Sequence, residues 1–297
     1  MYVKIAAPNR DGAARTRART DGSESVISGH SLFHGARRGV PIPSSMPRAR
    51  STGQRTAMPP VLSPGQCREV DRLCARKYGL PTIVLMETAG AAVADSVLEL
   101  PGGRLGRGVL VVAGGGNNGG DALVCARYLA NARVAMAVVL IAARSKLAPE
   151  TRTHLKICER MGIAVHEGAA RSAIQNAMAD LGKQTPGALV DGLFGTGLSR
   201  DVTGRAAAAI DCINELSRGG CAVVSVDIPS GLDAETGREL GVAVRADRTV
   251  TFVGIKKGML SKTAERLVGE VEVVDIGVPR AAVDEVLGGD RAGRRRG

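Results

Sequence analysis

The sequence predicts an α/β fold in which helices cover both faces of a central, mostly parallel β-sheet. Short apolar runs rich in β-branched residues alternate with segments of helical periodicity from residue 63 onwards. The runs contain almost no polar residues, as is typical of parallel strands buried on both faces. The longest uncharged apolar run has ten residues, Val134 to Ala143, whereas a membrane-spanning helix needs about 20. These observations favour a single Rossmann-like, three-layer αβα sandwich over residues 57–290 and no membrane span.

The expected elements follow this alternation in order. The first helix begins at Ser63, because Ser, Pro and Gln occupy its N-cap, first and third positions, and a second helix covers about residues 82–100. Further helices are expected near residues 119–131, 149–161, 170–181 and 205–217. Seven strands are expected at Val109–Ala113, Val134–Ile141, Ile163–His166, Ala188–Val190, Ala222–Val226, Thr249–Val253 and Val271–Val274.

Both ends of the chain are basic and lack sustained periodicity. Residues 1–56 contain ten Lys and Arg against three Asp and Glu, and the tail 291–297 contains four Arg and no acid. The first segment is expected to be a disordered leader, or an over-extended start with Met58 as the alternative beginning. Its Arg- and Ser-rich, acid-poor composition also fits an organelle-targeting peptide. We expect a cytoplasmic protein, with organelle targeting as the alternative.

The charge distribution argues against nucleic acid as a partner of the folded part. The whole chain has a formal net charge of +11, but residues 57–290 contain 26 basic and 26 acidic residues. Only six aromatic residues are available for stacking on bases. The six cysteines include no CxxC pair and most stand within apolar stretches, which favours buried, reduced thiols.

Four unusual segments follow predicted strands, at the sheet edge where α/β proteins bind ligands. The first, Gly114–Asp121, holds five glycines, two adjacent asparagines and an aspartate, and it opens a helix. Its backbone amides beside a helix amino terminus suit a phosphate group. It lacks the Lys-Ser/Thr of a Walker loop, and its polar side chains argue against a merely flexible connection. We therefore predict a ligand-binding loop.

The second segment, Asp191–Asp201, combines a glycine-rich turn with hydroxyl groups and a cation. Its glycines permit a nest of backbone amides, Thr196 and Ser199 supply hydroxyls, and Arg200 can pair with phosphate. Asp191, at the end of the strand, either faces the crevice or caps its own turn.

The third and fourth segments supply candidate acid–base groups. Asp227 ends an apolar strand, where it can act as a general acid or hydrogen-bond to its own Pro-Ser-Gly turn. Lys256 and Lys257 follow the strand Thr249–Val253, and one of them is expected to be a solvated turn residue. Asp227 is the first candidate for proton transfer, and Lys256 is the second.

Together these segments resemble the NAD(P)H-hydrate epimerase family, the YjeF amino-terminal domain. The resemblance covers about residues 63–280 in order. Its motifs are Leu-Met-Glu-Thr-Ala-Gly at 85–90, the Asn-Asn-Gly-Gly-Asp loop, Asp-Gly-Leu-Phe-Gly-Thr-Gly and Asp-Ile-Pro-Ser-Gly-Leu-Asp. Any one motif would be weak evidence, but four in register are highly specific. The departures are Gly115, Thr88, Ala122 and Ile255, where the family commonly has Pro, Asn, Gly and Pro.

The resemblance implies which residues bind ligands. Substrate contacts fall on Asn117, Asn118, Gly119, Gly120, Asp121, Gly195, Thr196, Gly197, Leu198, Ser199, Arg200, Asp201 and Asp227. A potassium ion is the implied cofactor, with Asn118, Asp191 and Ser230 as its ligands. The resemblance also implies a homodimer. Many relatives carry a fused dehydratase domain that this chain lacks, so we expect a separate ADP- or ATP-dependent dehydratase to act on the product.

The activity that the resemblance implies is epimerisation of the R and S forms of hydrated NADH and NADPH (NADHX and NADPHX), an isomerase reaction that repairs these cofactors. The alternative is a non-catalytic nucleotide- or RNA-binding module, because the same domain type resembles part of mRNA-decapping scaffold proteins. Retention of Asn118, Asp191, Asp227 and Ser230 favours the enzyme. A dehydrogenase is disfavoured, since no acidic residue is well placed about 20 residues beyond the glycine loop.

Overall fold

The computed structural model describes residues 2–5, 58–182 and 185–293 of the chain. The strands are β1 (Tyr2–Ile5), β2 (Val61–Leu62), β3 (Val109–Ala113), β4 (Met136–Leu140), β5 (Val165–His166), β6 (Ala188–Gly192), β7 (Ala222–Val226), β8 (Arg248–Phe252), β9 (Ile255–Lys256) and β10 (Glu270–Val274). The α-helices are α1 (Pro64–Lys77), α2 (Thr82–Leu98), α3 (Asn117–Asn131), α4 (Pro149–Arg160), α5 (Ala170–Asp180), α6 (Gly204–Arg218), α7 (Glu265–Val268) and α8 (Arg280–Gly293). Short 3₁₀ turns occupy Arg104–Arg107, Arg144–Lys146 and Lys257–Leu260.

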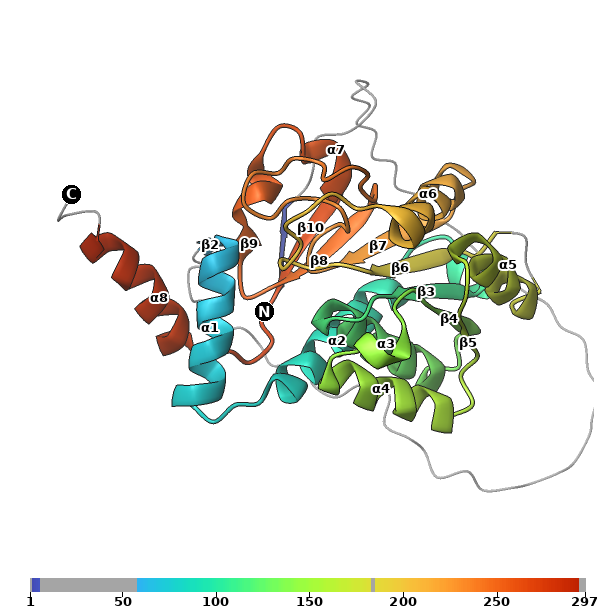
Figure 1. Cartoon of the computed structure of the whole chain (residues 1–297), viewed down its shortest axis with the longest axis horizontal. Helices are drawn as coiled ribbons and strands as arrows, with labels where there is room; N and C mark the ends of the chain where they lie inside the picture. Colours follow the sequence, from blue (N-terminus) through green and yellow to red (C-terminus); the bar gives the residue numbers. More distant parts are fainter. Residues whose placement is uncertain (1, 6–57, 183–184, 294–297) are drawn as a thin grey trace, which may run out of the picture. The chain divides into compact units, whose positions relative to one another are not determined.

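Eight strands form one sheet in the order β1-β10-β8-β7-β6-β3-β4-β5 (Figure 1). β1 pairs antiparallel with β10, and every other neighbouring pair is parallel. All seven predicted strands are present in this sheet, so the prediction of a mostly parallel sheet is confirmed. β2 and β9 pair separately as a short parallel ribbon.

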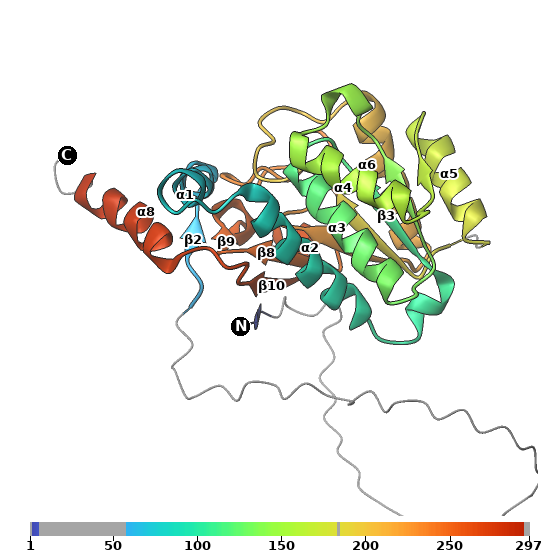
Figure 2. The same ribbon diagram turned by 90° about the horizontal axis from the view of Figure 1, so that it is seen from below.

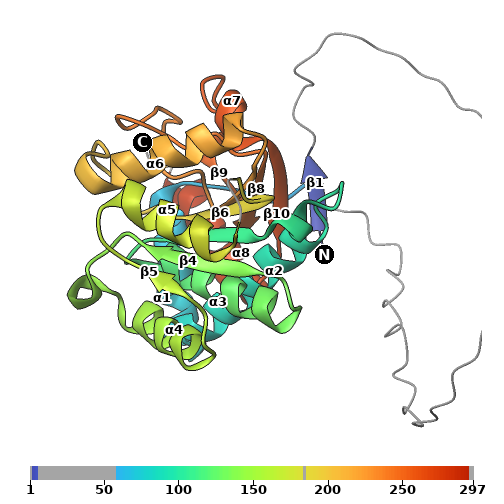
Figure 3. The same ribbon diagram turned by 90° about the vertical axis from the view of Figure 1, so that its right-hand side faces the viewer.

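Helices cover both faces of the sheet, with α5 and α6 on one side and α2, α3 and α4 on the other (Figure 3). Strand β3 shows why both faces must be covered, because all five of its residues are buried. Val109, Val111 and Ala113 pack into the core beneath α2 and α3. Leu110 and Val112 pack into the core beneath α5 and α6. Alternate residues of this uninterrupted apolar run therefore pack into two different cores, one on each face of the sheet.

Helices α2 and α3 approach each other closely at a glycine. A Cβ added to Gly90 would lie 2.4 Å from the Cβ of Val124. The Ala- and Gly-rich stretch of the second predicted helix therefore permits the close packing of α2 against α3.

Several boundaries differ from the prediction. Helix α3 begins at Asn117 rather than near residue 119, so the predicted Asn-Asn-Gly-Gly-Asp loop forms its first turn. β1 occupies Tyr2–Ile5, within the segment expected to lack regular structure. The rest of that predicted leader, residues 6–56, lies outside the described residues.

Helix α8 was not predicted from the sequence. It reaches Gly293, so the basic tail expected from Arg291 begins inside a helix. α8 extends away from the sheet beside α1 (Figure 2). Lys77 Nζ of α1 and a carboxylate oxygen of Glu285 on α8 form a 2.5 Å ion pair that joins the two helices.

The cysteines match the expectation of reduced thiols. All six are free, and all except Cys67 are buried. Within the described part of the chain, no helix combines the length and apolar character needed to cross a membrane.

Candidate active site

The chain changes direction across the sheet between β3 and β6. After β3 it adds β4 and β5 on one side, and it then places β6 and β7 on the other side. The connections that leave β3 and β6 therefore diverge, and open α/β sheets bind ligands at such a point. A pocket of about 940 Å³ lies there. Its walls come from α1, α2, the two diverging connections and the residues that follow β7 and β8.

The amino end of α3 opens onto this pocket. The connection from β3 is tight, because a Cβ on Gly114 would lie 2.0 Å from the carbonyl oxygen of Leu193 in the connection after β6. No side chain caps α3 at its N-cap residue, Gly116, so the amides of the first turn have no side-chain acceptor. These amides and the helix dipole together favour an anionic group.

The structure divides the predicted run Asn117–Asp121 into two groups. Three of its members line the pocket: Asn117, Asn118 and Asp121. The two glycines lie behind it. A Cβ on Gly119 would lie 2.0 Å from the Gly114 carbonyl oxygen, and a Cβ on Gly120 would lie 2.4 Å from the Met86 sulfur. The glycines therefore allow α3 to pack closely, while the polar residues face the pocket.

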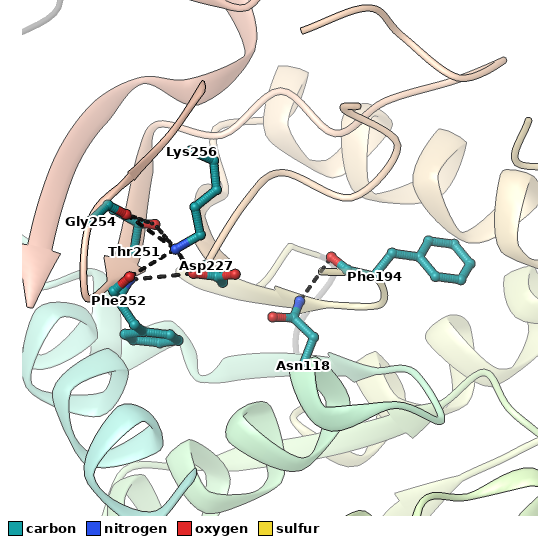
Figure 4. A network of polar contacts seen from close by, with 7 residues as sticks. All are labelled: Asn118, Phe194, Asp227, Thr251, Phe252, Gly254 and Lys256. Carbon is teal, nitrogen blue, oxygen red and sulfur yellow. Dashed lines mark hydrogen bonds and ion pairs between the residues drawn. The ribbon is translucent and has the colours of Figure 1, made fainter. Parts of the chain in front are cut away.

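The second predicted segment forms another wall of the pocket. All of its predicted ligand-binding residues, 195–201, line the cavity. Asn118 Nδ2 donates a 2.9 Å hydrogen bond to the carbonyl oxygen of Phe194 (Figure 4). This bond connects the first turn of α3 to the 195–201 wall. Arg200 is exposed on that wall and supplies a positive charge suited to phosphate.

Asp191 and Ser230 lie behind the pocket and are fully buried. Ser230 Oγ donates a 2.6 Å hydrogen bond to Asp191 Oδ1, and Asp191 Oδ2 accepts 2.9 Å bonds from Ser225 Oγ and the Ser230 amide. Burial raises the pKa of Asp191, and these hydrogen bonds oppose the rise. Ser230 Oγ also accepts a 2.9 Å bond from the Phe194 amide. One network therefore links Asp191 and Ser230 to Asn118 through Phe194.

Asp227 follows β7 with its backbone in the left-handed region, at φ 62°. Aspartate tolerates this conformation better than most residues do. Its amide donates a 2.7 Å hydrogen bond to the carbonyl oxygen of Val250 in β8, which holds the turn. Asp227 Oδ1 lies 2.5 Å from Lys256 Nζ and also accepts bonds from Thr251 Oγ1 (3.2 Å) and the Phe252 amide (3.3 Å) (Figure 4). No described residue donates to Oδ2, so that oxygen can accept from a ligand.

Lys256 is enclosed, with only 3% of its side chain exposed. Besides its ion pair with Asp227, Nζ donates to Thr251 Oγ1 (2.9 Å) and to the carbonyl oxygens of Phe252 (2.8 Å) and Gly254 (3.2 Å). An ammonium group has three protons, and these four acceptors, Asp227 included, share them. The structure brings the two predicted acid–base residues together, with Lys256 as the counter-ion and Asp227 as the more exposed member.

Sequence reasoning missed three titratable pocket residues on α1, namely Cys67, Arg68 and Asp71. Burial, followed by the charge of Asp227, raises the pKa of Asp71 to about 6. Burial and the charges of Asp227 and Asp71 raise the pKa of Asp121 well above its usual range. The pocket thus collects three carboxyl groups around Lys256. The i, i+4 spacing of Cys67 and Asp71 marks one helix face, but no local signal shows what that face contacts.

Comparisons with known proteins agree on one family. The family model described as "YjeF-related protein N-terminus" matches residues 82–258. The NAD(P)H-hydrate epimerase of Oenococcus oeni is 40% identical over 217 residues, which cover 73% of this chain and 96% of that protein. The NAD(P)H-hydrate epimerase of Rhodopirellula baltica is 36% identical over 229 residues, which cover 75% of this chain and 88% of that protein.

Longer relatives match only in part. The bifunctional NAD(P)H-hydrate repair enzyme Nnr of Moorella thermoacetica is 38% identical over 224 residues, and the match covers 75% of this chain but 41% of that enzyme. The chain therefore spans about two fifths of the bifunctional relative. Among solved structures, the crystal structure of yeast ynu0 (YNL200c) aligns with a TM-score of 0.58 at 24% identity, covering 67% of this chain and 82% of that chain. At this identity the likeness concerns the fold alone.

Proposed function

The chain belongs to the family of YjeF-related protein N-termini, and we propose that it is an NAD(P)H-hydrate epimerase, which interconverts the R and S forms of hydrated NADH and NADPH. Two relatives with that name match it over most of their own length. The observation that carries the proposal is the pair of Asp227 and Lys256 at the wall of a pocket that also receives the amino end of α3. One cavity thus contains a carboxylate that can transfer protons and a site for an anionic group. This combination suits a nucleotide whose ring loses water and takes it up again.

Binding would use the two walls at the topological switch point. The uncapped amides at the start of α3 suit the pyrophosphate of a dinucleotide, and the run 195–201 supplies further amides, hydroxyls and Arg200. Asn117, Asn118 and Asp121 would contact the hydrated nucleotide from the first turn of α3. The tight Gly114 connection brings these two walls together.

The chemistry follows from the structure of the substrate. C6 of the hydrated ring bears a hydroxyl beside the ring nitrogen, so the group is a hemiaminal. Protonation of that hydroxyl lets the C6–O bond break, and the nitrogen lone pair forms an iminium as water leaves. Water then adds to the opposite face of C6 and loses a proton. Asp227 Oδ2 is the group that we assign to accept or donate that proton.

Lys256 positions the Asp227 carboxylate for this proton transfer. Its ammonium group holds Asp227 Oδ1 at 2.5 Å, and Thr251 Oγ1 and the Phe252 amide fix the same oxygen. The carboxylate is therefore oriented before the substrate binds. Such preorganisation leaves little reorganisation for the moment of proton transfer.

The donor set behind the pocket fits a potassium ion. Asp191 is a fully buried carboxylate whose hydrogen bonds come from neutral groups. Among the described residues no cluster of three or more His, Cys, Asp or Glu could hold a metal ion, which disfavours a transition metal. Asn118, Asp191 and Ser230 would hold the ion through neutral and carboxylate oxygens. When bound, potassium would supply a positive charge that offsets Asp191 and stabilises the surrounding loops.

The family relationship also suggests how the product is used. The bifunctional relative of Moorella thermoacetica is named as a repair enzyme with two activities, so we propose that an ADP- or ATP-dependent dehydratase, as a partner or a fused domain, consumes the product. We propose that the chain works as a homodimer. We also propose a cytoplasmic location, because the free thiols fit a reducing compartment.

A direct assay tests the proposed function. The purified chain would be incubated with chromatographically separated R-NADHX, and formation of the S form would be followed after subtraction of the spontaneous rate. We expect clear acceleration. No acceleration over the blank, combined with retained binding of nucleotide or RNA, would overturn the proposal in favour of a non-catalytic module.

A further inference from the structure

Helix α1 is fixed against the strand that carries Lys256. β2 and β9 pair in parallel, with Leu62 opposite Lys256, and the Ile255 amide donates a 2.9 Å hydrogen bond to the Pro60 carbonyl oxygen. Only Ser63 separates β2 from α1, and it caps the helix through a reciprocal pair of bonds with Gln66. The strand pairing and the cap therefore fix the direction of α1 where the helix begins, next to the strand that carries Lys256.

One face of α1 then forms a wall of the pocket. Cys67 and Asp71, one helical turn apart, both line the cavity together with Asp227 and Lys256. The Asp71 carboxyl has no hydrogen bond or ion pair with any described residue. Asp71 is an exposed residue of α1, and the walls of the pocket that it lines partly desolvate its carboxyl group. A carboxyl group without a structural partner therefore faces the same space as the Asp227 pair.

Several titratable and charged groups surround Asp71. They are Cys67, Arg68 and Cys74 on α1 itself, Asp121 on α3, Asp227 after β7 and Lys256 on β9. Lys256 is the buried cation among them, and Asp227 already pairs with it. Burial and the negative charge of Asp227 together raise the pKa of Asp71 to about 6. Near neutral pH, Asp71 can therefore both hold and release a proton.

We propose that Asp71 is a second catalytic residue of this site and exchanges the proton of the C6 hydroxyl from the wall formed by α1, while Asp227 acts from the wall formed by the strand ends. The inference rests on the proposed epimerase function. Asp71 lies outside residues 82–258, which the family model matches. Epimerisation needs water to leave one face of C6 and to enter the other, so two groups on different walls suit the reaction better than one.

The proton balance closes without another reactant. The Asp71 carboxyl gives its proton to the C6 hydroxyl, the C6–O bond breaks, and water leaves as the ring nitrogen forms the C=N bond of the iminium. A water molecule then bonds to the opposite face of C6 and passes a proton to Asp227. The net result is one proton moved from Asp71 to Asp227. The opposite conversion, or exchange with water in the pocket, returns the proton.

Asp121 is less suited to this exchange. It is 9% exposed, has no hydrogen bond with a described residue, and its pKa is raised well above the usual range. Burial therefore limits the access of the water that would replace a proton on this carboxyl group between turnovers. Asp71 differs because it is an exposed residue, so water can reach its carboxyl group and replace the proton in each turnover.

The test is Asp71→Asn in the full chain, with Glu69→Gln as the matched control. Glu69 is on the same helix and pairs with Arg72, outside the pocket lining. We expect Asp71→Asn to lower kcat for R-NADHX and S-NADHX by about 10²-fold or more, with a much smaller change in KM. Glu69→Gln should leave both constants near the wild-type values. Asp71→Glu, which retains a carboxyl group, should recover part of kcat.

The pH profile separates proton transfer from a structural role. Since Asp71 must be protonated to act as the acid, wild-type kcat should fall as pH rises through about 6, after the spontaneous rate is subtracted at each pH. This fall should be absent from the residual activity of Asp71→Asn. Wild-type kcat and an unchanged profile in folded Asp71→Asn would overturn the inference. Failure of the proposed function would appear differently, as no epimerisation by the wild-type chain.

Discussion

Lys256 Nζ lies 2.5 Å from Asp227 Oδ1, and the lysine side chain is 3% exposed while that of the aspartate is 14% exposed. The lysine has further acceptors in Thr251, Phe252 and Gly254, whereas Asp227 Oδ2 has no described partner. A buried cation thus holds a carboxylate at the wall of a pocket. Loss of either residue should therefore affect turnover and stability in different ways.

Asp227→Asn should lower kcat by about 10²–10⁴-fold, because general acid–base catalysis contributes about that factor and an amide does not titrate. KM should change much less, since the amide retains the shape and can still contact the ligand. Initial rates of epimerisation, corrected for the spontaneous reaction, give both constants. Asp284→Asn, an exposed change on α8 outside the pocket, is the control. A near-wild-type kcat in folded Asp227→Asn would assign proton transfer to another group.

The same pair predicts a stability difference between single and double variants. Asp227→Asn leaves Lys256 buried without its counter-ion, which should reduce the free energy of unfolding by about 3 kcal/mol. Adding Lys256→Met removes the uncompensated charge and should recover much of that loss, while turnover stays low. Denaturant unfolding of the two single variants and the double variant measures the coupling. Additive losses of stability would show that the ion pair contributes nothing.

Asp71→Asn should stabilise the protein near pH 7.5. The pKa of Asp71 is raised to about 6 in the folded chain, so the folded state disfavours the ionised carboxylate that the unfolded chain accepts. Its contribution is therefore favourable at low pH and is lost as pH rises through about 6. Thermal unfolding of both proteins from pH 4.5 to 8 should show a gain for Asp71→Asn that shrinks below pH 6. A constant difference at every pH would contradict this assignment.

Potassium should stabilise the protein and support turnover. At ten times its dissociation constant, an ion that binds only the folded state adds about 1.4 kcal/mol to the free energy of unfolding. Replacing potassium chloride with choline chloride should lower the melting temperature and kcat, and magnesium should not substitute. Asp191→Asn should lose the response to potassium, whereas Asp275→Asn, at an exposed turn, should keep it. Equal activity in potassium-free buffer would remove the ion from the proposal.

Gly119→Ala should destabilise the fold, because the new Cβ would lie 2.0 Å from the Gly114 carbonyl oxygen. Overpacking of this kind usually reduces the free energy of unfolding by about 1–3 kcal/mol. Gly106→Ala is the matched control, since its Cβ would meet nothing within 4 Å and Gly106 does not line the pocket. Equilibrium unfolding compares the two. Equal stability of the variants would mean that α3 can move away from the connection after β3.

The sequence by itself determined the seven main strands and the position of each ligand-binding segment at a strand end. These features are local. An apolar run such as Val109–Ala113 must be covered on both faces wherever it lies, and a glycine-rich segment that follows such a run must turn. The same local pattern predicts that Asp227 is the carboxylate at the end of its strand.

Only the tertiary structure decided which residues meet across the sheet. Strand order places the ends of β3 and β6 side by side, and the pairing of β2 with β9 brings α1, with Asp71, to the pocket that contains Lys256. β1 and β2 are too short for periodicity to reveal, and the packing of α8 on α1 depends on a distant partner, Glu285 against Lys77. Such contacts join residues far apart in the chain, and packing rather than local propensity selects them.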